Sequence, residues 1–516
     1  MANTNEINGE VLQLEEQLWG FRLYDEQTAL LTLLEFLFLA GRRKFEIENN
    51  NILCAPRYDG PSHLYLRTIL FKNPKLETSS DWDDWETSFR DENEEMPGFP
   101  KLWHAEGLKN SFGDFENFRH AVRLLRSATD SNGSDRKWTF RFLFPWSQAQ
   151  IYPDIKDKPS GTDFACPRNR FGRTGEMAWL LARLSPDKNT LYNELQNRFE
   201  DPKHPFAQLC VQIEKEYGDQ PNVTFPTQSY LPESVLTNPI IQERANKLCD
   251  DLVALLRLEL KTEDLVDPLS RIIGMHLICY QIECARHAAV DSRLRANERP
   301  FFLCEAIQRQ SSAVRRESRE NFQQNCNLCR LVLLENFASR FNEIEQISDI
   351  DNRCERFRIL FGTRAAESKQ IKERIRLTDL SELRKDMTDA LENKFDRHSG
   401  EFHSKMSRHI GLTTKTFAKG YRYAPCDELL LALVLSTVRA EHMPLSVFLR
   451  QIYEKYGLAY DAECADAANR AQNVRNDLTA NTERLLDQIR SLGLLEHLSD
   501  SCDYVINPYF RSANKS

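Results

Sequence analysis

The sequence has little glycine, no excess of basic residues and no apolar run long enough to cross a bilayer. Only 19 of its 516 residues are glycine, which leaves little material for glycine-rich phosphate loops. The formal net charge is −9, so any contact with DNA must come from a local patch of positive charge. The apolar run at 29–40 is too short to span a membrane and contains Glu35. We therefore expect no membrane partner, and a buried helix capped at Asp25.

The cysteines also lack a pattern. There are 13 of them, an odd number, and they are scattered, which favours reduced thiols. No signal-peptide pattern opens the sequence, and we expect a cytoplasmic location. Cys326 and Cys329 form a CxxC pair, but the nearest thiols, Cys304 and Cys354, do not form a second one. Structural zinc needs four ligands, so we expect no metal and no cofactor.

The length and the helical periodicity predict a mainly α, multidomain protein. A strictly alternating strand pattern at 137–144 favours a small α/β domain over residues 1–150. Long amphipathic runs, such as 241–260 and 265–289, predict a helical domain over residues 151–425. The remaining residues, 426–516, form a separate pattern that predicts a winged helix-turn-helix domain.

That C-terminal pattern consists of three helices followed by two short strands. Asp427 can cap the first helix, Pro444 suits the first turn of the second, and Gly457 can end it. Asn481 or Thr482 opens a third helix with a core stripe at Leu485, Leu486, Ile489 and Leu492. Strands are predicted at 494–498 and 504–506. This is the winged-helix order, in which the third helix would enter the groove of DNA.

Basic side chains accompany this domain and make it the best nucleic-acid candidate. The predicted DNA-binding residues are Lys415, Lys419, Arg422, Arg484 and Arg490. The first three alternate with aromatic residues just before the domain, a combination that suits nucleic acid. The outward face of the third helix, however, also carries Asn481, Glu483 and Asp487, and its two carboxylates repel phosphate. Docking of a protein is therefore the alternative.

Two further binding candidates precede the helical domain. Three arginines stand before a predicted helix N-terminus and form a candidate anion site: Arg168, Arg170 and Arg173. Pairing with the acidic surface is the simpler interpretation of these arginines. Trp82 and Trp85 lie in an acidic segment at 81–95 and are candidates for binding a partner, unless the segment is a solvated loop. Arginines are also frequent at 286–319, where interleaved glutamates fit a solvated helix.

The run RSLGLLEHLSDSCDYV at 490–505 resembles the C-terminal ending of accessory, non-catalytic subunits of bacterial DNA-defence operons of the phosphorothioate-dependent restriction type. The resemblance implies a DNA-binding or scaffolding subunit of a prokaryotic anti-phage or DNA-processing complex. It also implies double-stranded DNA and other defence subunits as partners, including a ring-forming ATPase or helicase.

The alternative function is that of a metal-dependent nuclease subunit in a restriction-like system. Asp154, Glu259 and Lys261 could imitate the carboxylates and lysine of such an enzyme, but Glu259 falls in an expected helix rather than a strand. No serine–histidine–aspartate signature or phosphate loop is found, and no catalytic residue is predicted.

Overall fold

The structure is a computed structural model of the 516-residue chain. It describes a set of segments separated by gaps. These are residues 7, 12, 14–20, 28–43, 114, 116–117, 119–120, 156–157, 164–165, 174–200, 203, 236–295, 299–307, 312–397, 399–416, 420–468, 474–497 and 502–510.

Helices dominate the described residues, which confirms the prediction of a mainly α protein. In chain order the helices are α1 (Leu14–Trp19), α2 (Ala29–Arg43), α6 (Thr174–Leu184), α7 (Lys188–Phe199), α10 (Pro239–Leu256), α11 (Thr262–Ala288), α12 (Ser292–Arg295), α13 (Ala313–Glu345), α14 (Ile350–Phe361), α15 (Thr363–Glu367), α16 (Lys369–Lys372), η6 (Arg374–Arg376), α17 (Ser381–Arg397), α18 (Ser399–His409), α19 (Asp427–Thr437), α20 (Leu445–Tyr456), α21 (Ala462–Ala467) and α22 (Arg475–Ser491). The strands are β1 (Lys156–Asp157), β2 (Phe164–Ala165), β3 (Phe302–Leu303), β4 (Thr413–Thr416), β5 (Gly420–Tyr423), β6 (His442–Pro444), β7 (Leu458–Ala459), β8 (Leu495–His497) and β9 (Asp503–Ile506).

Helix α11 lies at the centre of the described body. It is 27 residues long and is buried on nearly every side from Leu265 to Ala285, as expected of a helix with apolar residues all round. Helices α2, α10, α13 and α19 pack around it. Helix α10 begins at a well-formed cap, because the Asn238 side chain accepts a hydrogen bond from the Ile240 amide and Pro239 occupies the first turn.

The expected buried helix near the N-terminus is α2, and it packs against α6. Its cap is Thr28, whose hydroxyl accepts the Leu31 amide at 3.1 Å, so the prediction of Asp25 as the cap was wrong. Glu35 is buried and accepts the Gly175 amide at 2.9 Å. A Cβ atom on Gly175 would lie 2.5 Å from the Thr32 carbonyl oxygen, so this glycine allows the two helices to approach closely.

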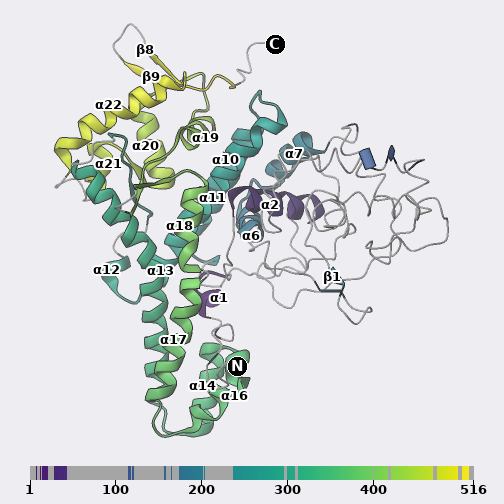
Figure 1. Ribbon diagram of the computed structural model, residues 1–516, viewed down its shortest axis with the longest axis vertical. Coiled ribbons are helices and arrows are strands. Elements are labelled where there is room, and N and C mark those ends of the chain that lie inside the picture. The colour runs from purple at the N-terminus through teal and green to yellow at the C-terminus, as the bar shows by residue number, and fades with distance from the viewer. Residues whose placement is uncertain are drawn as a thin grey trace.

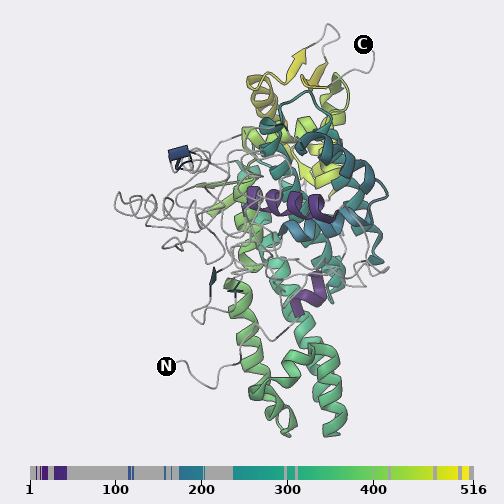
Figure 2. The ribbon, with the colours of Figure 1, turned by 90° about the vertical axis from the view of Figure 1, so that its right-hand side faces the viewer.

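A helical arm extends from the body. Helices α13 and α17 run side by side, and α14 and α16 lie toward the far end (Figure 1). Helix α13 has 33 residues and begins at Ser312, whose hydroxyl accepts the Arg315 amide at 3.1 Å. In both views the arm points away from the C-terminal strands (Figure 2).

The C-terminal unit, residues 426–510, contains a three-stranded antiparallel sheet of order β6-β9-β8. Met443 pairs with Val505, which pairs in turn with Leu495. The sequence predicted β8 and β9 but missed β6, because Pro444, expected inside the second helix, ends this strand directly before α20. Helix α22 begins at Arg475, earlier than predicted, and α19 starts with Asp427 rather than being capped by it.

The C-terminal unit shares a core with the helical body. One continuous apolar cluster runs from Ile7 to Val505, and strand β7 pairs in parallel with β3. Gly457 ends α20 with φ 82°, as its predicted role as a helix terminator requires. Its carbonyl accepts the Phe302 amide at 2.8 Å, which starts the β3–β7 pairing.

The predicted α/β domain over residues 1–150 lies largely outside the described residues, including its strand at 137–144. Among the helices that the structure describes, none combines the length and the apolar character needed to cross a membrane.

Gly457→Ala should destabilise the protein much more than Gly493→Ala. Both glycines have positive φ, which costs an L-residue about 1–2 kcal/mol. A Cβ atom at Gly457 would in addition lie 2.1 Å from the Pro300 carbonyl oxygen, whereas one at Gly493 would meet nothing within 4 Å. Thermal unfolding of the two variants measures the difference, and equal melting temperatures would contradict close contact between β7 and the Pro300 segment.

Candidate nucleic-acid interface

The structure separates the predicted DNA-binding residues. Lys415 lies on β4, with its ammonium 5.5 Å from the centre of the Tyr421 ring. Arg422, on the paired strand β5, is only 6% exposed and forms an ion pair with the buried Glu305. The prediction that Arg422 contacts DNA was therefore wrong, because its guanidinium is used inside the protein. The alternation of β5 places Tyr421 and Arg422 on opposite faces, which the basic-aromatic pattern alone did not reveal.

Arg484 and Arg490 lie on the outward face of α22, where their side chains are 51% and 57% exposed. Both flank Asp487, at 3.6 Å and 3.0 Å respectively. Arg475, at the start of the same helix, pairs with Asp466 at 2.8 Å. Each of these arginines thus has a carboxylate nearby, and the face is nearly balanced in charge.

The opposite face of α22 is buried, and it includes a residue predicted to point outward. Leu485 and Ile489 are in the core as expected. Asn481 is 0% exposed, so its predicted outward position was wrong. Its Oδ1 accepts the Ala306 amide at 2.7 Å, and its Nδ2 donates to the carbonyls of Cys304 and Tyr460. Asn481 thereby fixes α22 to the segment that follows β3.

The other predicted site residues lie outside the described residues. These are Lys419, the anion-site arginines Arg168, Arg170 and Arg173, and the tryptophans Trp82 and Trp85. Of the nuclease set, Asp154 is also outside, whereas Glu259 and Lys261 are exposed in the connection between α10 and α11. The sequence predicted that Glu259 lies in a helix, and that prediction was wrong, because α10 ends at Leu256 and α11 begins at Thr262.

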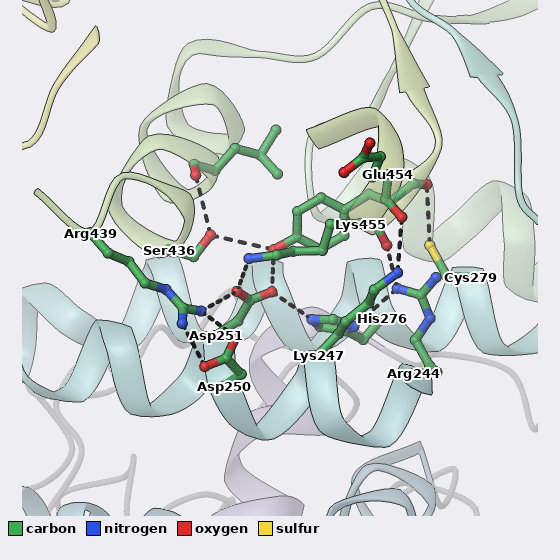
Figure 3. A network of polar contacts seen from close by, with 12 residues as sticks. Arg244, Lys247, Asp250, Asp251, His276, Cys279, Ser436, Arg439, Glu454 and Lys455 are labelled. Carbon is green, nitrogen blue, oxygen red and sulfur yellow. Dashed lines mark hydrogen bonds and ion pairs between the residues drawn. The ribbon is translucent and has the colours of Figure 1, made fainter. Parts of the chain in front are cut away.

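A buried polar network joins the C-terminal unit to the helical body (Figure 3). Its centre is the Asp251 carboxylate on α10, which has no exposure to solvent. Asp251 accepts hydrogen bonds from the Tyr456 hydroxyl at 2.5 Å and from the Lys455 ammonium, both on α20. It also bonds His276 Nε2 of α11 at 3.0 Å, and Arg439, following α19, approaches at 3.4 Å.

Arg244 extends this network along α10. Its guanidinium pairs with the buried Glu283 at 2.6 Å and donates to the Lys455 carbonyl at 2.8 Å. The same nitrogen, Nη1, that donates to the Lys455 carbonyl also lies 3.4 Å from His276 Nδ1. Because Arg244 is a donor only, that contact favours the neutral His276 tautomer with its proton on Nε2, which donates to Asp251.

The charges in this network are set by burial and by their partners. Burial alone would raise the pKa of Asp251, but Lys455 and the hydrogen bond from His276 lower that pKa below its usual range. Burial lowers the pKa of His276 to about 4, against the opposing effect of Asp251. At neutral pH the network therefore holds an ionised Asp251 and a neutral His276.

The network has no space for a substrate beside Arg244 and Lys455. The gap there is about 10 Å³, close to the minimum that a single water molecule needs. We interpret the network as a structural joint that fixes the position of α20 and hence of the C-terminal unit. The sequence does carry a signal for this joint, because Asp251 and His276 are isolated polar residues within apolar runs. The joint was not predicted from that signal.

The CxxC cysteines lie on α13, where burial raises the pKa of both thiols to about 12. Protonated thiols are poor metal ligands. Among the residues that the structure describes, no three or more His, Cys, Asp and Glu side chains are grouped to hold a metal ion. The expectation that the protein binds no zinc stays a prediction.

No protein-family model matches the sequence, and no curated protein is significantly similar to it.

His276→Gln should reduce the acid sensitivity of the protein. An unfolded histidine titrates near pH 6.5, roughly, and folded His276 near 4. The neutral form of His276 therefore contributes fully to the free energy of unfolding above the unfolded pKa. This contribution, on the order of 3 kcal/mol in total, is lost as the pH falls toward 4. Urea unfolding from pH 7 to pH 4.5 measures this loss.

The matched control is His287→Gln, because His287 is an exposed histidine near the end of the same helix. The His276 variant should be less stable than the wild type at pH 7, and the difference should shrink with acid. If the free energy of unfolding depends on pH in the same way in the wild type and the His276 variant, a neutral buried His276 is contradicted.

Proposed function

We propose that the chain is a cytoplasmic, non-catalytic DNA-binding or scaffolding subunit of a prokaryotic anti-phage or DNA-processing complex. In this proposal residues 426–516 are a winged helix-turn-helix that presents α22 to a partner. A ring-forming ATPase or helicase and double-stranded DNA are the partners that the resemblance of 490–505 implies.

The observation that carries the proposal is the order of elements in the C-terminal unit. The order is helix α19, strand β6, helix α20, strand β7, helices α21 and α22, and strands β8 and β9. In the sheet, β9 lies between β6 and β8. A winged helix has three helices, with the last one as the recognition helix and the final two strands as the wing. The unit resembles this order, with β7 and α21 as additions between the second and the last helix.

The charges on α22 favour docking of a protein over reading of duplex DNA. Phosphate binding needs unpaired cations, and Arg484 and Arg490 both lie beside Asp487. A surface of alternating charge suits a protein partner of complementary charge, to which it gives specificity. The buried joint at Asp251 supports the same role, because it holds α20 in one position against α10 and α11.

Replacing Arg484 and Arg490 by alanine together should release the partner while leaving the fold intact, because both side chains are exposed. The experiment is purification of the tagged chain from its own host, with mass spectrometry of bound proteins and sequencing of bound nucleic acid. The wild type should recover an ATPase or helicase subunit, and the double variant should recover much less of it.

The matched control is Arg358→Ala with Arg364→Ala, which removes the same charge from exposed positions on the arm and breaks the comparable Arg358–Glu355 pair. Duplex binding is measured in parallel. If the Arg484 and Arg490 variant instead weakens duplex binding for unrelated sequences, with a salt slope reduced by about one per lost contact, α22 is a DNA-binding helix. A chain recovered alone, without duplex binding, would refute the proposal.

A further inference from the structure

A cleft of about 970 Å³ lies between the helical body and the C-terminal unit. Its walls are the middle of α13, the segment around Pro300 that follows α12, and the ends of α20 and α21, which can be located in Figure 1. Its size is at the upper end of the range for small-molecule sites. It lies apart from the outward face of α22, whose residues do not line it.

Positive charge is concentrated in this cleft although the chain as a whole is acidic. Three arginines from successive segments line it: Arg286 of α11, Arg293 of α12 and Arg299. They face two glutamates, Glu320 and Glu454. The Arg299 side chain is 64% exposed and lies 3.9 Å from the Glu243 carboxylate. The Arg293 side chain is 89% exposed and pairs with Asp291 at 2.7 Å, so a bound phosphate would compete with that carboxylate. Arginine forks are suited to bidentate binding of phosphate.

Two asparagines one turn apart on α13 line the same cleft, and both are almost fully buried. Asn321 is 7% exposed and Asn325 is 3% exposed. Asn321 Oδ1 accepts the Leu303 amide at 2.9 Å, which fixes the orientation of its amide and leaves Nδ2 as a donor. Asn325 has the reverse arrangement, because its Nδ2 donates to the Phe301 carbonyl and the Tyr423 hydroxyl, which leaves Oδ1 as an acceptor.

The two amides therefore offer the cleft one hydrogen-bond donor and one acceptor. Neither Asn321 Nδ2 nor Asn325 Oδ1 has a partner within the part of the chain that the structure describes. Neither atom is among the buried polar atoms without a partner, so both are open to the cleft, where a ligand can pair with them. Exposed Gln323 and Asn327 add further amides at the rim.

We propose that this cleft binds a nucleotide, with its phosphate on the arginines and the edge of its base on Asn321 and Asn325. Adjacent donor and acceptor groups are what every common base presents along its pairing edge, and asparagine is suited to them. The backbone N–H and C=O groups of an acidic peptide can also pair with these amides, so polyglutamate is the competing ligand in the test. The nucleotide is either free or one unit of a single strand, and the site is independent of the role proposed for α22.

The test measures binding to the full chain at low salt with four probes: ATP, a mixed-sequence single-stranded oligonucleotide, tripolyphosphate and a polyglutamate peptide. The oligonucleotide is a 15-mer, about the length that a single-strand binding site covers. Arg293→Ala with Arg299→Ala should weaken binding of ATP or the 15-mer by about tenfold or more. The control that removes equal charge is again Arg358→Ala with Arg364→Ala, which should bind as the wild type does.

Asn321→Asp tests the base contact, because aspartate keeps the acceptor for the Leu303 amide and removes the Nδ2 donor. It should weaken ATP or 15-mer binding more than tripolyphosphate binding, and its melting temperature confirms folding. Binding of ATP alone identifies a free nucleotide, and binding of the 15-mer alone identifies a strand; both support the proposal. Equal binding of polyglutamate, binding unchanged in the arginine variant, or no binding of either nucleotide probe would overturn it.

Discussion

The arrangement of the described helices depends most on the contacts that compensate the ionised Asp251 carboxylate. A carboxylate without solvent is costly unless it is fully compensated, and here the compensation comes from two other helices. Lys455 and Tyr456 reach it from α20, and His276 reaches it from α11. Loss of any one partner leaves charge uncompensated in the core, so these helices have one favourable mutual position.

A second buried carboxylate acts in the same way on the other side of the C-terminal unit. Glu305 receives both Arg315 of α13 and Arg422 of β5. The adjoining backbone of Ala306 is held by Asn481 of α22. Helices α20 and α22 are therefore each fixed to the body by buried polar contacts, and the outward face of α22 is presented on a rigid support.

Apolar periodicity was enough to predict the runs that form α10 and α11, although not their bounds. Turn chemistry was enough to predict Gly457 as the end of α20. The predicted turn after residue 498 also located β8 and β9, because a short segment with strand character lies on each side of it. The strand β6 was missed because its residues carry no alternation of their own and pair only with a distant strand. Arg422 and Asn481 were misplaced for a related reason, since a polar residue buried by a partner far away in sequence looks like a surface residue locally.

The parallel pairing of β3 with β7 has a consequence for how the chain folds during synthesis. Phe302 and Leu458 are neighbours in space but far apart in sequence, so this contact has a high contact order. While the ribosome is still making α13 to α19, the β3 edge is unpaired and Arg244 lacks its acceptor, the Lys455 carbonyl. These contacts are completed only when α20 and β7 emerge, and until then the unpaired β3 edge is open to pairing with another strand.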